Sequence, residues 1–331
     1  MTDFTEKRLF ELFDKMKNKH IVVIGDLMID RYVWGSVNRI SPEAPVPVVE
    51  VTHESERLGG AANVGSNIVS LGGRCTLIGV SGNDSNADVL RKLIGELKMN
   101  SSGVITDNSR MTTVKTRVIA QNQHVVRIDN EQKHDISSDI TDQILSYLER
   151  DIQAIDGIIL EDYNKGVLTK ELIQRVIELA NKHNKLITVD PKLNHFFEYK
   201  NVSVFKPNLK EISEGLGRNI KSESEVMSAG RELQKRLNAK HVLITRSEKG
   251  MSLFSGNTDY FHIPTHAREV ADVSGAGDTV IATLTLALAG GATPEEASSL
   301  SNLGGGLVVG EVGIVPASPE KIIEFWREIS V

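Results

Sequence analysis

Short apolar runs rich in β-branched residues recur along the chain, and segments of helical length separate most of them. Runs of this kind are typical of strands that are buried on both faces. They are IVVIG at 21–25, TLIGV at 76–80, GIIL at 157–160, LITV at 186–189, VSVF at 202–205 and VLIT at 242–245. Their alternation with helices predicts an α/β fold, in which helices cover both faces of a mainly parallel sheet.

Two regions lack this alternation. Residues 31–57 contain three prolines and alternating apolar positions. Residues 112–130 alternate like an antiparallel pair of strands around Gln121–Gln123. We therefore expect a small β layer, formed by about 31–57 and 112–130, that is inserted in one α/β domain spanning residues 1–331.

Composition and charge exclude several classes of function. The 331 residues are 40% hydrophobic and 25% charged, which is ordinary for a globular protein. A net charge of −6 argues against a nucleic-acid partner. The first twenty residues have a charged helical pattern rather than that of a secretory signal, and the longest apolar run is shorter than the roughly 20 residues of a membrane span. With Cys75 as its single cysteine, the chain fits a reducing compartment. We expect a cytoplasmic protein with no membrane partner.

Polar residues end or follow five of the predicted strands. They are Asp26, Asp162, Asp190, Asn208 and Thr245. Ligands of open α/β sheets bind outside the carboxyl ends of the strands, so these groups are expected to converge on one edge. The alternative for each residue is a turn or a helix cap, since Asp and Asn are common in both.

The segment DVSGAGDTVIATLTLALAGG at 272–291 predicts a buried helix that begins at a glycine-rich turn. Backbone amides at a helix N-terminus bind anions, and the helix dipole adds to this. A phosphate at Gly275-Ala276-Gly277 would lie beside Asp278, whose carboxylate is then placed to deprotonate an attacking hydroxyl. The alternative is an aspartate that only caps the helix. The turn matches neither G-x-x-x-x-G-K-[ST] nor G-x-G-x-x-G.

A second helix start rich in small residues is Gly59-Gly60-Ala61-Ala62-Asn63. The glycines allow a substrate to approach the backbone, and Asn63 both donates and accepts hydrogen bonds. The alternative is a turn with a capping asparagine.

Together these motifs resemble the PfkB/ribokinase family of sugar kinases over essentially the whole chain. GGAAN and DVSGAGDT are similar to the two signature regions of the family in order and spacing, and KPN followed by Glu211 is similar to its N-x-x-E element. The resemblance implies a ribokinase-like three-layer α/β/α sandwich with a β-sheet lid. It also implies ATP and Mg²⁺ as cofactors and a homodimer formed through the lid.

Within this family the chain is most similar to kinases of D-glycero-β-D-manno-heptose 7-phosphate, in GDLMIDRYVWGSVNRISPEAPVPVVEV, RLGGAANV, LEDYNKG, VDPK and TRSEKGMSLF. The resemblance implies transfer of phosphate from ATP to the anomeric 1-hydroxyl, giving the 1,7-bisphosphate used for lipopolysaccharide inner-core heptose. Many such kinases are fused to a nucleotidyltransferase with an H-x-G-H element. That element does not occur here, so we expect another protein to perform adenylyl transfer.

Three alternatives stay open. Another PfkB-type kinase would act on ribose, fructose or a nucleoside, and a non-catalytic protein would only sense a sugar phosphate. A dinucleotide-dependent oxidoreductase lacks its expected glycine fingerprint.

The resemblance assigns the acceptor side of the site as follows. Sugar hydroxyls are expected at Asp26, Asp30 and Asn63, with Gly59 and Gly60 allowing close approach and Asp162 nearby. The phosphate of the substrate requires cations, and the alternative for each is a solvated surface charge. The candidates are Arg39, Lys115, Arg117, Arg127, Lys165 and Lys192. Tyr32 and Trp34 contact the sugar or a second protomer, or they form the core of the lid.

The nucleotide side is assigned to the C-terminal half of the chain. Asn208 and Glu211 are expected on the phosphate side, with Glu211 holding Mg²⁺ through water. Asp272 is a candidate ligand for K⁺, which some relatives bind. The helix that begins at Thr293-Pro294 is expected to border the adenine. The further nucleotide candidates are Thr245, Ser247, Gly250, Asn302 and Gly305.

Overall fold

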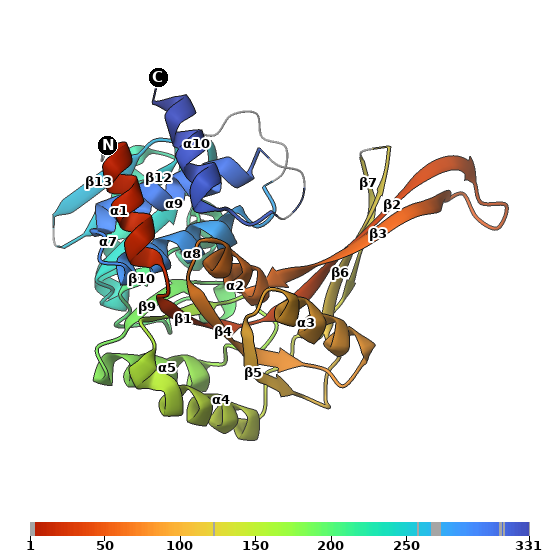
Figure 1. Cartoon of the computed structure of the whole chain (residues 1–331), viewed down its shortest axis with the longest axis horizontal. Helices are drawn as coiled ribbons and strands as arrows, with labels where there is room; N and C mark the ends of the chain where they lie inside the picture. The colour runs from red at the N-terminus through yellow and green to blue at the C-terminus, as the bar shows by residue number, and fades with distance from the viewer. Residues whose placement is uncertain are drawn as a thin grey trace.

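The structure is a computed structural model that describes residues 4–121, 123–256, 258–265, 273–310, 313 and 315–330. Within these residues the chain forms a large sheet with the strand order β13-β12-β11-β10-β9-β8-β1-β4-β5 and a small sheet with the order β3-β2-β6-β7 (Figure 1). The strands of the large sheet are β1 His20–Gly25, β4 Arg74–Ser81, β5 Asn100–Thr106, β8 Gly157–Glu161, β9 Leu186–Asp190, β10 Val204–Phe205, β11 His241–Thr245, β12 Met251–Ser255 and β13 Asp259–Ile263.

The predicted parallel sheet is confirmed. Neighbouring strands are parallel throughout the part of the large sheet with the order β11-β10-β9-β8-β1-β4-β5. Strands β12 and β13 extend the sheet beyond β11 as antiparallel strands. All six predicted strands are present, although β10 is limited to Val204–Phe205. The prediction omitted β5, β12 and β13. The edge strands β5 and β13 each contain a single buried residue and lack a continuous apolar run, whereas β12 is almost entirely buried.

Helices cover both faces of the large sheet, and β1 shows how the sequence achieves this. Ile21 and Val23 face one core, whereas Val22 and Ile24 face the other, because successive side chains of a strand point to opposite faces. The first core contains α1 Glu6–Met16, α2 Ala61–Ser70, α3 Ser85–Glu96, α8 Ala276–Ala289, α9 Pro294–Val308 and α10 Pro319–Ile329. The second contains α4 Ser138–Asp151, α5 Lys170–Lys182, α6 Leu209–Gly215 and α7 Glu223–Leu237.

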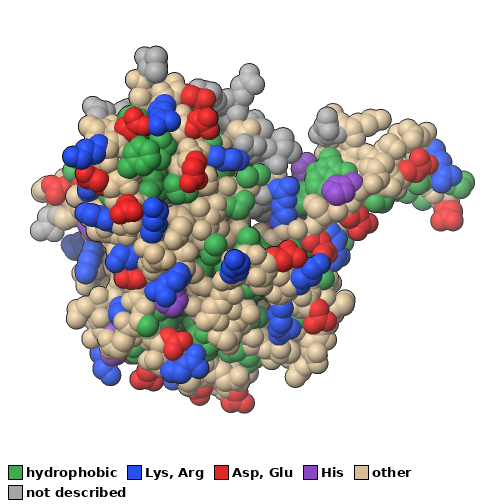
Figure 2. Space-filling model, in the orientation of Figure 1, with side chains coloured by type: hydrophobic (Ala, Val, Ile, Leu, Met, Phe, Trp, Pro, Cys, Tyr) green, Lys and Arg blue, Asp and Glu red, His purple; other side chains and the backbone are tan. Residues whose placement is uncertain are grey.

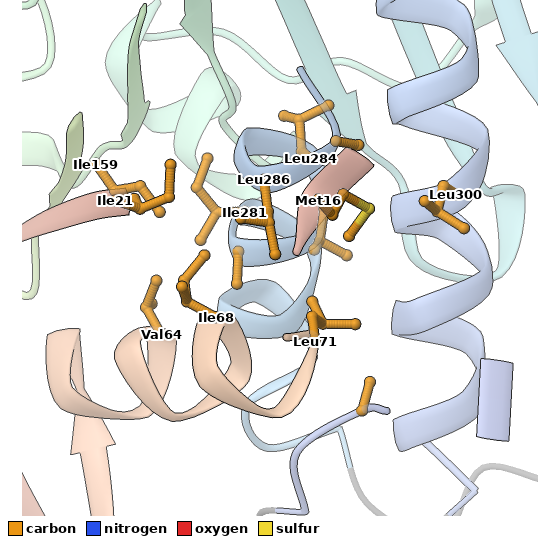
Figure 3. Close-up of a cluster of buried hydrophobic side chains, with 14 of the residues drawn as sticks. Met16, Ile21, Val64, Ile68, Leu71, Ile159, Ile281, Leu284, Leu286 and Leu300 are labelled. Atoms are coloured by element: carbon orange, nitrogen blue, oxygen red, sulfur yellow. The ribbon is translucent and has the colours of Figure 1, made fainter. Parts of the chain in front are cut away.

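Helix α8 is the central element of the first core. Figure 3 shows it between α2 and α9, with Ile281 directed toward Ile68 and with Leu300 on the other side. Its residues from Asp278 to Ala287 are all buried, as the apolar segment predicts. Burial on every side fixes the position and direction of this helix, and therefore fixes the position of its N-terminus.

The small sheet is the predicted β layer, which we call the lid. It consists of β2 Leu27–Ile40, β3 Pro47–Gly60, β6 Thr113–Ala120 and β7 Gln123–Asn130, so it begins earlier and ends later than the predicted boundary at 31–57. Strands β2 and β6 pair in parallel, whereas the outer pairs are antiparallel. The lid projects as an arm beyond the body of the molecule (Figures 1 and 2).

The connections of the lid explain its relation to the large sheet. Strand β2 starts two residues after β1 ends, and β3 leads directly into α2. The base of the lid therefore lies at the carboxyl edge of the large sheet, beside the first turn of α2. Within the described part of the chain, none of the helices is both long and apolar enough to cross a membrane.

Candidate active site

A cavity of about 670 Å³ opens at the carboxyl ends of β9, β10 and β11, against the first turn of α8 and one side of α9. It lies at the edge where strand-end residues were predicted to converge. Eleven of the predicted site residues line it: Lys192, Asn208, Thr245, Ser247, Gly250, Gly275, Ala276, Gly277, Asp278, Asn302 and Gly305.

The first turn of α8 forms the floor of this cavity. Gly275 is the N-cap of α8. Its backbone φ is 80°, a value that residues other than glycine rarely adopt. The first intrahelical bond of the turn joins the amide of Thr279 to the carbonyl of Gly275. The amides of Gly277 and Asp278 precede that bond, and such amides lack helical acceptors. The turn therefore presents N–H groups and the positive end of the helix dipole to the cavity.

Asp278 is buried beside this turn and is held by two donors from distant segments. Asn63 Nδ2 donates to one carboxylate oxygen at 2.7 Å, and the hydroxyl of Tyr163 donates to the other at 2.8 Å. Burial raises the pKa of Asp278 to about 6, although both hydrogen bonds act in the opposite direction. The carboxylate is thus ionised at neutral pH and is more basic than an ordinary aspartate.

Tyr163 lies on the loop after β8, and Asp26 holds that loop in place. The Asp26 carboxylate accepts the backbone N–H groups of Tyr163, Lys165 and Val167 at 2.8, 3.1 and 3.2 Å. Burial, and then the charge of Asp162, raise the pKa of Asp26 to about 6. The carboxylate predicted to bind sugar hydroxyls is therefore engaged in positioning the tyrosine that contacts Asp278.

Charged side chains form one wall of the cavity, which Asp190, Lys192 and Lys206 line. Residue Glu161 at the end of β8 is in register with Asp190 at the end of β9. Lys206 Nζ lies 2.7 Å from one carboxylate oxygen of Asp190, and Lys192 Nζ lies 3.5 Å from the other. Because Lys206 and Asp190 are both buried, each requires the other as its counter-charge.

Glu161 is the exception among these charged side chains. It is completely buried, and among the described residues neither of its carboxylate oxygens has a hydrogen-bond partner. Burial, followed by the charges of Asp190 and Asp278, raises its pKa well above the ordinary value of 4.5. We therefore infer that the Glu161 carboxyl is protonated more readily than that of an ordinary glutamate.

Asn208 and Glu211 position each other at the start of α6. Each side chain accepts the backbone N–H of the other, at 2.9 and 2.8 Å, and Lys192 Nζ lies 2.6 Å from the remaining Glu211 oxygen. Among the described residues, no three His, Cys, Asp or Glu side chains are arranged to hold a metal ion. The carboxylate of Glu211 and the amide oxygen of Asn208 are the kind of oxygen donors that can hold the water ligands of a hydrated divalent cation.

Several predicted residues lie outside the cavity and have partners elsewhere. Asp30 pairs with Arg117, and Lys165 lies 2.6 Å from Glu131. Asp162 accepts the hydroxyl of Tyr199 at 2.7 Å. The structure does not bring Arg39 to the site, because it lies on the exposed part of β2 and faces Glu50. Arg127 pairs with Asp129 at 2.9 Å, and Asp272 lies outside the described residues.

The lid glycines and aromatic residues have packing roles in this structure. A Cβ on Gly59 would lie 2.2 Å from Asp30 Oδ2, and one on Gly60 would lie 2.5 Å from the carbonyl of Asp26. The rings of Tyr32 and Trp34 stack with centroids 5.4 Å apart, and Trp34 also stacks on His53. These contacts join β2 to β3 within the lid, where Tyr32 is buried, Trp34 is half-buried and His53 is exposed.

The pfkB family carbohydrate kinase model matches residues 18–321. The chain belongs to this family. It is 45% identical over 304 residues to the bifunctional protein HldE of Helicobacter pylori strain J99, and 43% identical over 317 residues to that of Geobacter sulfurreducens. These alignments cover 92% and 96% of this carbohydrate kinase, which spans about 65% of the length of either relative.

Solved structures show the same fold. Escherichia coli phosphofructokinase-2 in complex with potassium superposes on 95% of the kinase with a TM-score of 0.76 and 20% identity, over all of its own chain. Arabidopsis thaliana ribokinase complexed with ribose and ATP covers 94% of it, over 99% of the ribokinase chain, with a TM-score of 0.73 and 18% identity. The ribokinase-like fold predicted for this carbohydrate kinase is thereby confirmed.

Sequence reasoning missed three side chains of the site. Lys206 and Glu161 lie at or just beyond strand ends, so the rule that selected Asp190 would also have selected them. Tyr163 follows Asp162 in the motif LEDYNKG, but its hydrogen bond to Asp278 spans 115 residues of chain. No local sequence pattern predicts a hydrogen bond between residues so far apart in the chain.

Glu161→Gln tests the burial of this carboxyl. The native state of the wild type binds a proton more tightly than the unfolded state does, so its stability falls as the pH rises above the ordinary glutamate value. The variant lacks this loss because glutamine does not ionise. We expect the free energy of unfolding of the variant, relative to the wild type, to increase between about pH 5 and about pH 8 in urea unfolding. An equal difference at both pH values would contradict the inferred pKa.

Proposed function

We propose that this kinase transfers the γ-phosphoryl group of ATP to the anomeric 1-hydroxyl of D-glycero-D-manno-heptose 7-phosphate, giving the 1,7-bisphosphate. The observation that carries the proposal is Asp278, a buried carboxylate of raised pKa beside the glycine-headed first turn of α8. The choice of heptose is supported by the HldE relatives and by the lid and strand-end motifs that resemble heptose 7-phosphate kinases.

In the proposed reaction Asp278 is the general base. Its carboxylate accepts the proton of the sugar hydroxyl as the hydroxyl oxygen attacks the γ-phosphorus, and ADP leaves with the electrons of the bond that breaks. The Gly275–Gly277 turn, through the amides of Gly277 and Asp278, stabilises the negative charge on the transferring group. Lys192 and Lys206 line the same cavity and add positive charge beside it.

The nucleotide is proposed to occupy the cavity between β11 and α9. Thr245, Ser247 and Gly250 line one side, and Asn302 and Gly305 line the other. Mg²⁺, bound with the nucleotide, supplies charge neutralisation to the phosphates, and Asn208 and Glu211 are the residues proposed to hold its water ligands. A role for K⁺ is supported only by the potassium complex of a structural relative.

The sugar is proposed to lie between Asn63 and the base of the lid. Asn63 already contacts Asp278. A sugar hydroxyl that reaches the Asp278 carboxylate therefore also comes within reach of the Asn63 amide. The product carries a phosphate at each end and would serve as the precursor of lipopolysaccharide inner-core heptose after further conversion by other activities.

We also propose that the kinase forms a homodimer through the lid. The lid exposes apolar side chains that a second copy would cover, and they are Ile40, Val46, Val51, Val126 and Ile128. Light scattering of the purified chain tests this assignment. A dimer that becomes a monomer in Val126→Asp is expected, and a monomeric wild type would contradict it.

Phosphorus NMR of a reaction with heptose 7-phosphate and ATP tests the function directly. We expect a new anomeric phosphate signal that grows with the signals of ADP. Asp278→Asn should reduce kcat by at least ~100-fold with little change in nucleotide affinity, because it removes the base and leaves the amide turn intact. Phosphorylation of an unphosphorylated sugar in preference would contradict the proposal, and a substantial kcat in Asp278→Asn would contradict the role of Asp278.

Tyr163→Phe tests the hydrogen bond to the base. In the wild type, kcat/KM should fall as the pH drops below about 6, because the base becomes protonated. The tyrosine hydroxyl stabilises the charged form, so its removal raises the pKa of Asp278 and moves the midpoint upward by about 0.5–1 pH unit. Tyr199→Phe is the matched control, since it removes a hydroxyl that bonds to Asp162. An unshifted midpoint in Tyr163→Phe would show that the bond does not act on the base.

A further inference from the structure

Lys115 lies on β6 of the lid, and its side chain points toward Tyr163 at the carboxyl edge of the large sheet. Its ammonium is 5.4 Å from the centroid of the Tyr163 ring, and the hydroxyl of that ring donates to Asp278. One tyrosine side chain therefore separates Lys115 from the proposed base. Lys115 is also in register with Asp30, which places both residues on the face of the lid that is turned to the site.

The other candidate cations are already neutralised by acids. Within the described chain, Lys115 alone among the six candidate cations has neither a hydrogen bond nor an ion pair to a carboxylate. The pairs formed by the others are Arg39–Glu50, Arg117–Asp30, Arg127–Asp129, Lys165–Glu131 and Lys192–Glu211. Lys206, which the sequence did not suggest, pairs with Asp190.

The surroundings of Lys115 make this lack of a partner costly. The side chain is partly buried, and burial, followed by the charge of Lys165, lowers the pKa of its ammonium below the ordinary value. The charges of Asp30, Glu131 and Asp129 act on its pKa in the opposite direction, but among the described residues none of these acids forms a hydrogen bond or ion pair with it. An anion that contacts the ammonium directly would supply that close partner. The ring of Tyr163 supplies only a weak cation–π contact in its place.

The position of Lys115 distinguishes between two sources of an anion. Lys192 and Lys206 line the nucleotide cavity, whereas Lys115 belongs to the lid and is not part of that lining. Lys192 also approaches the ring of Tyr163, at 5.5 Å, but from the loop after β9. Lys115 therefore lies outside the cavity proposed for the nucleotide, on the side of the lid.

We propose that Lys115 binds the phosphate group of a phosphorylated sugar acceptor, and that this contact selects sugar phosphates over unphosphorylated sugars. The inference rests on the proposed function and adds the residue that determines its specificity. The acceptor would extend from Lys115 past Tyr163 to Asp278. Its phosphate would contact Lys115 on the lid, and its reacting hydroxyl would contact the Asp278 carboxylate.

Steady-state kinetics of Lys115→Met with heptose 7-phosphate and ATP test the proposal. We expect the KM for the sugar phosphate to rise ~10–100-fold, as for the loss of a hydrogen bond to a charged group, with kcat and the KM for ATP changed less than about threefold. Lys115→Arg should recover most of the affinity, because it restores the charge. Lys92→Met is the matched control, since it removes an exposed lysine of α3, and it should leave all three constants unchanged.

The outcomes separate this inference from the proposed function. A wild type that phosphorylates only unphosphorylated sugars would overturn the proposed function. A wild type that uses heptose 7-phosphate, combined with an unchanged KM in Lys115→Met, would overturn the role of Lys115 alone. A rise confined to the KM for ATP would also overturn it, by assigning Lys115 to the nucleotide. If Lys115→Met does not fold, Lys115→Gln under the same assay decides between these results.

Discussion

The site depends on one buried carboxylate that three separate segments hold in place. Asp278 comes from α8, Asn63 from α2 and Tyr163 from the loop after β8, and both of its oxygens accept a hydrogen bond. A buried carboxylate without such donors would be neutralised by protonation. The two donors keep it charged at neutral pH, while burial keeps its pKa near 6 and so preserves its basicity. The packing of α8 between α2 and α9 is what makes this geometry rigid.

The carboxyl edge of the sheet concentrates charges that must balance one another. The acids Glu161, Asp190 and Asp278 and the cations Lys192 and Lys206 are close enough to influence each other's pKa. Lys206 compensates Asp190, and Lys192 is shared between Asp190 and Glu211. This leaves Glu161 without a compensating partner among the described residues. Bound phosphates would interact with Lys192 and Lys206, which also neutralise the acids of this edge. Nucleotide binding would therefore change the pKa values of these acids.

Much of this arrangement was predictable from the sequence, for a physical reason. Parallel strands end at one edge, so a residue that follows a buried run is placed without knowledge of the rest of the fold. This reasoning selected Asp190, Asn208 and Thr245, whereas the turn before Asp278 was selected as the glycine-rich start of a buried helix. Arg39 and Asp30 were instead assigned by the resemblance, and the structure pairs them with Glu50 and Arg117, because the sequence does not reveal how far along the lid a residue lies or which partner it takes. Tyr163 was missed because its contact joins segments that only the folded chain brings together.

The large sheet and the lid contribute different groups to the site. The sheet fixes the base and the amide turn through buried contacts that surround α8, so the chemistry it supports does not depend on the identity of the sugar. The lid meets this edge mainly through side chains that are already paired with one another, as Arg117 is with Asp30. A paired cation offers little to a new anion, because the existing bond must be replaced. Lys115 forms no such pair among the described residues, so at the site proposed for the acceptor phosphate an anion could bind it without replacing an existing bond of the lid.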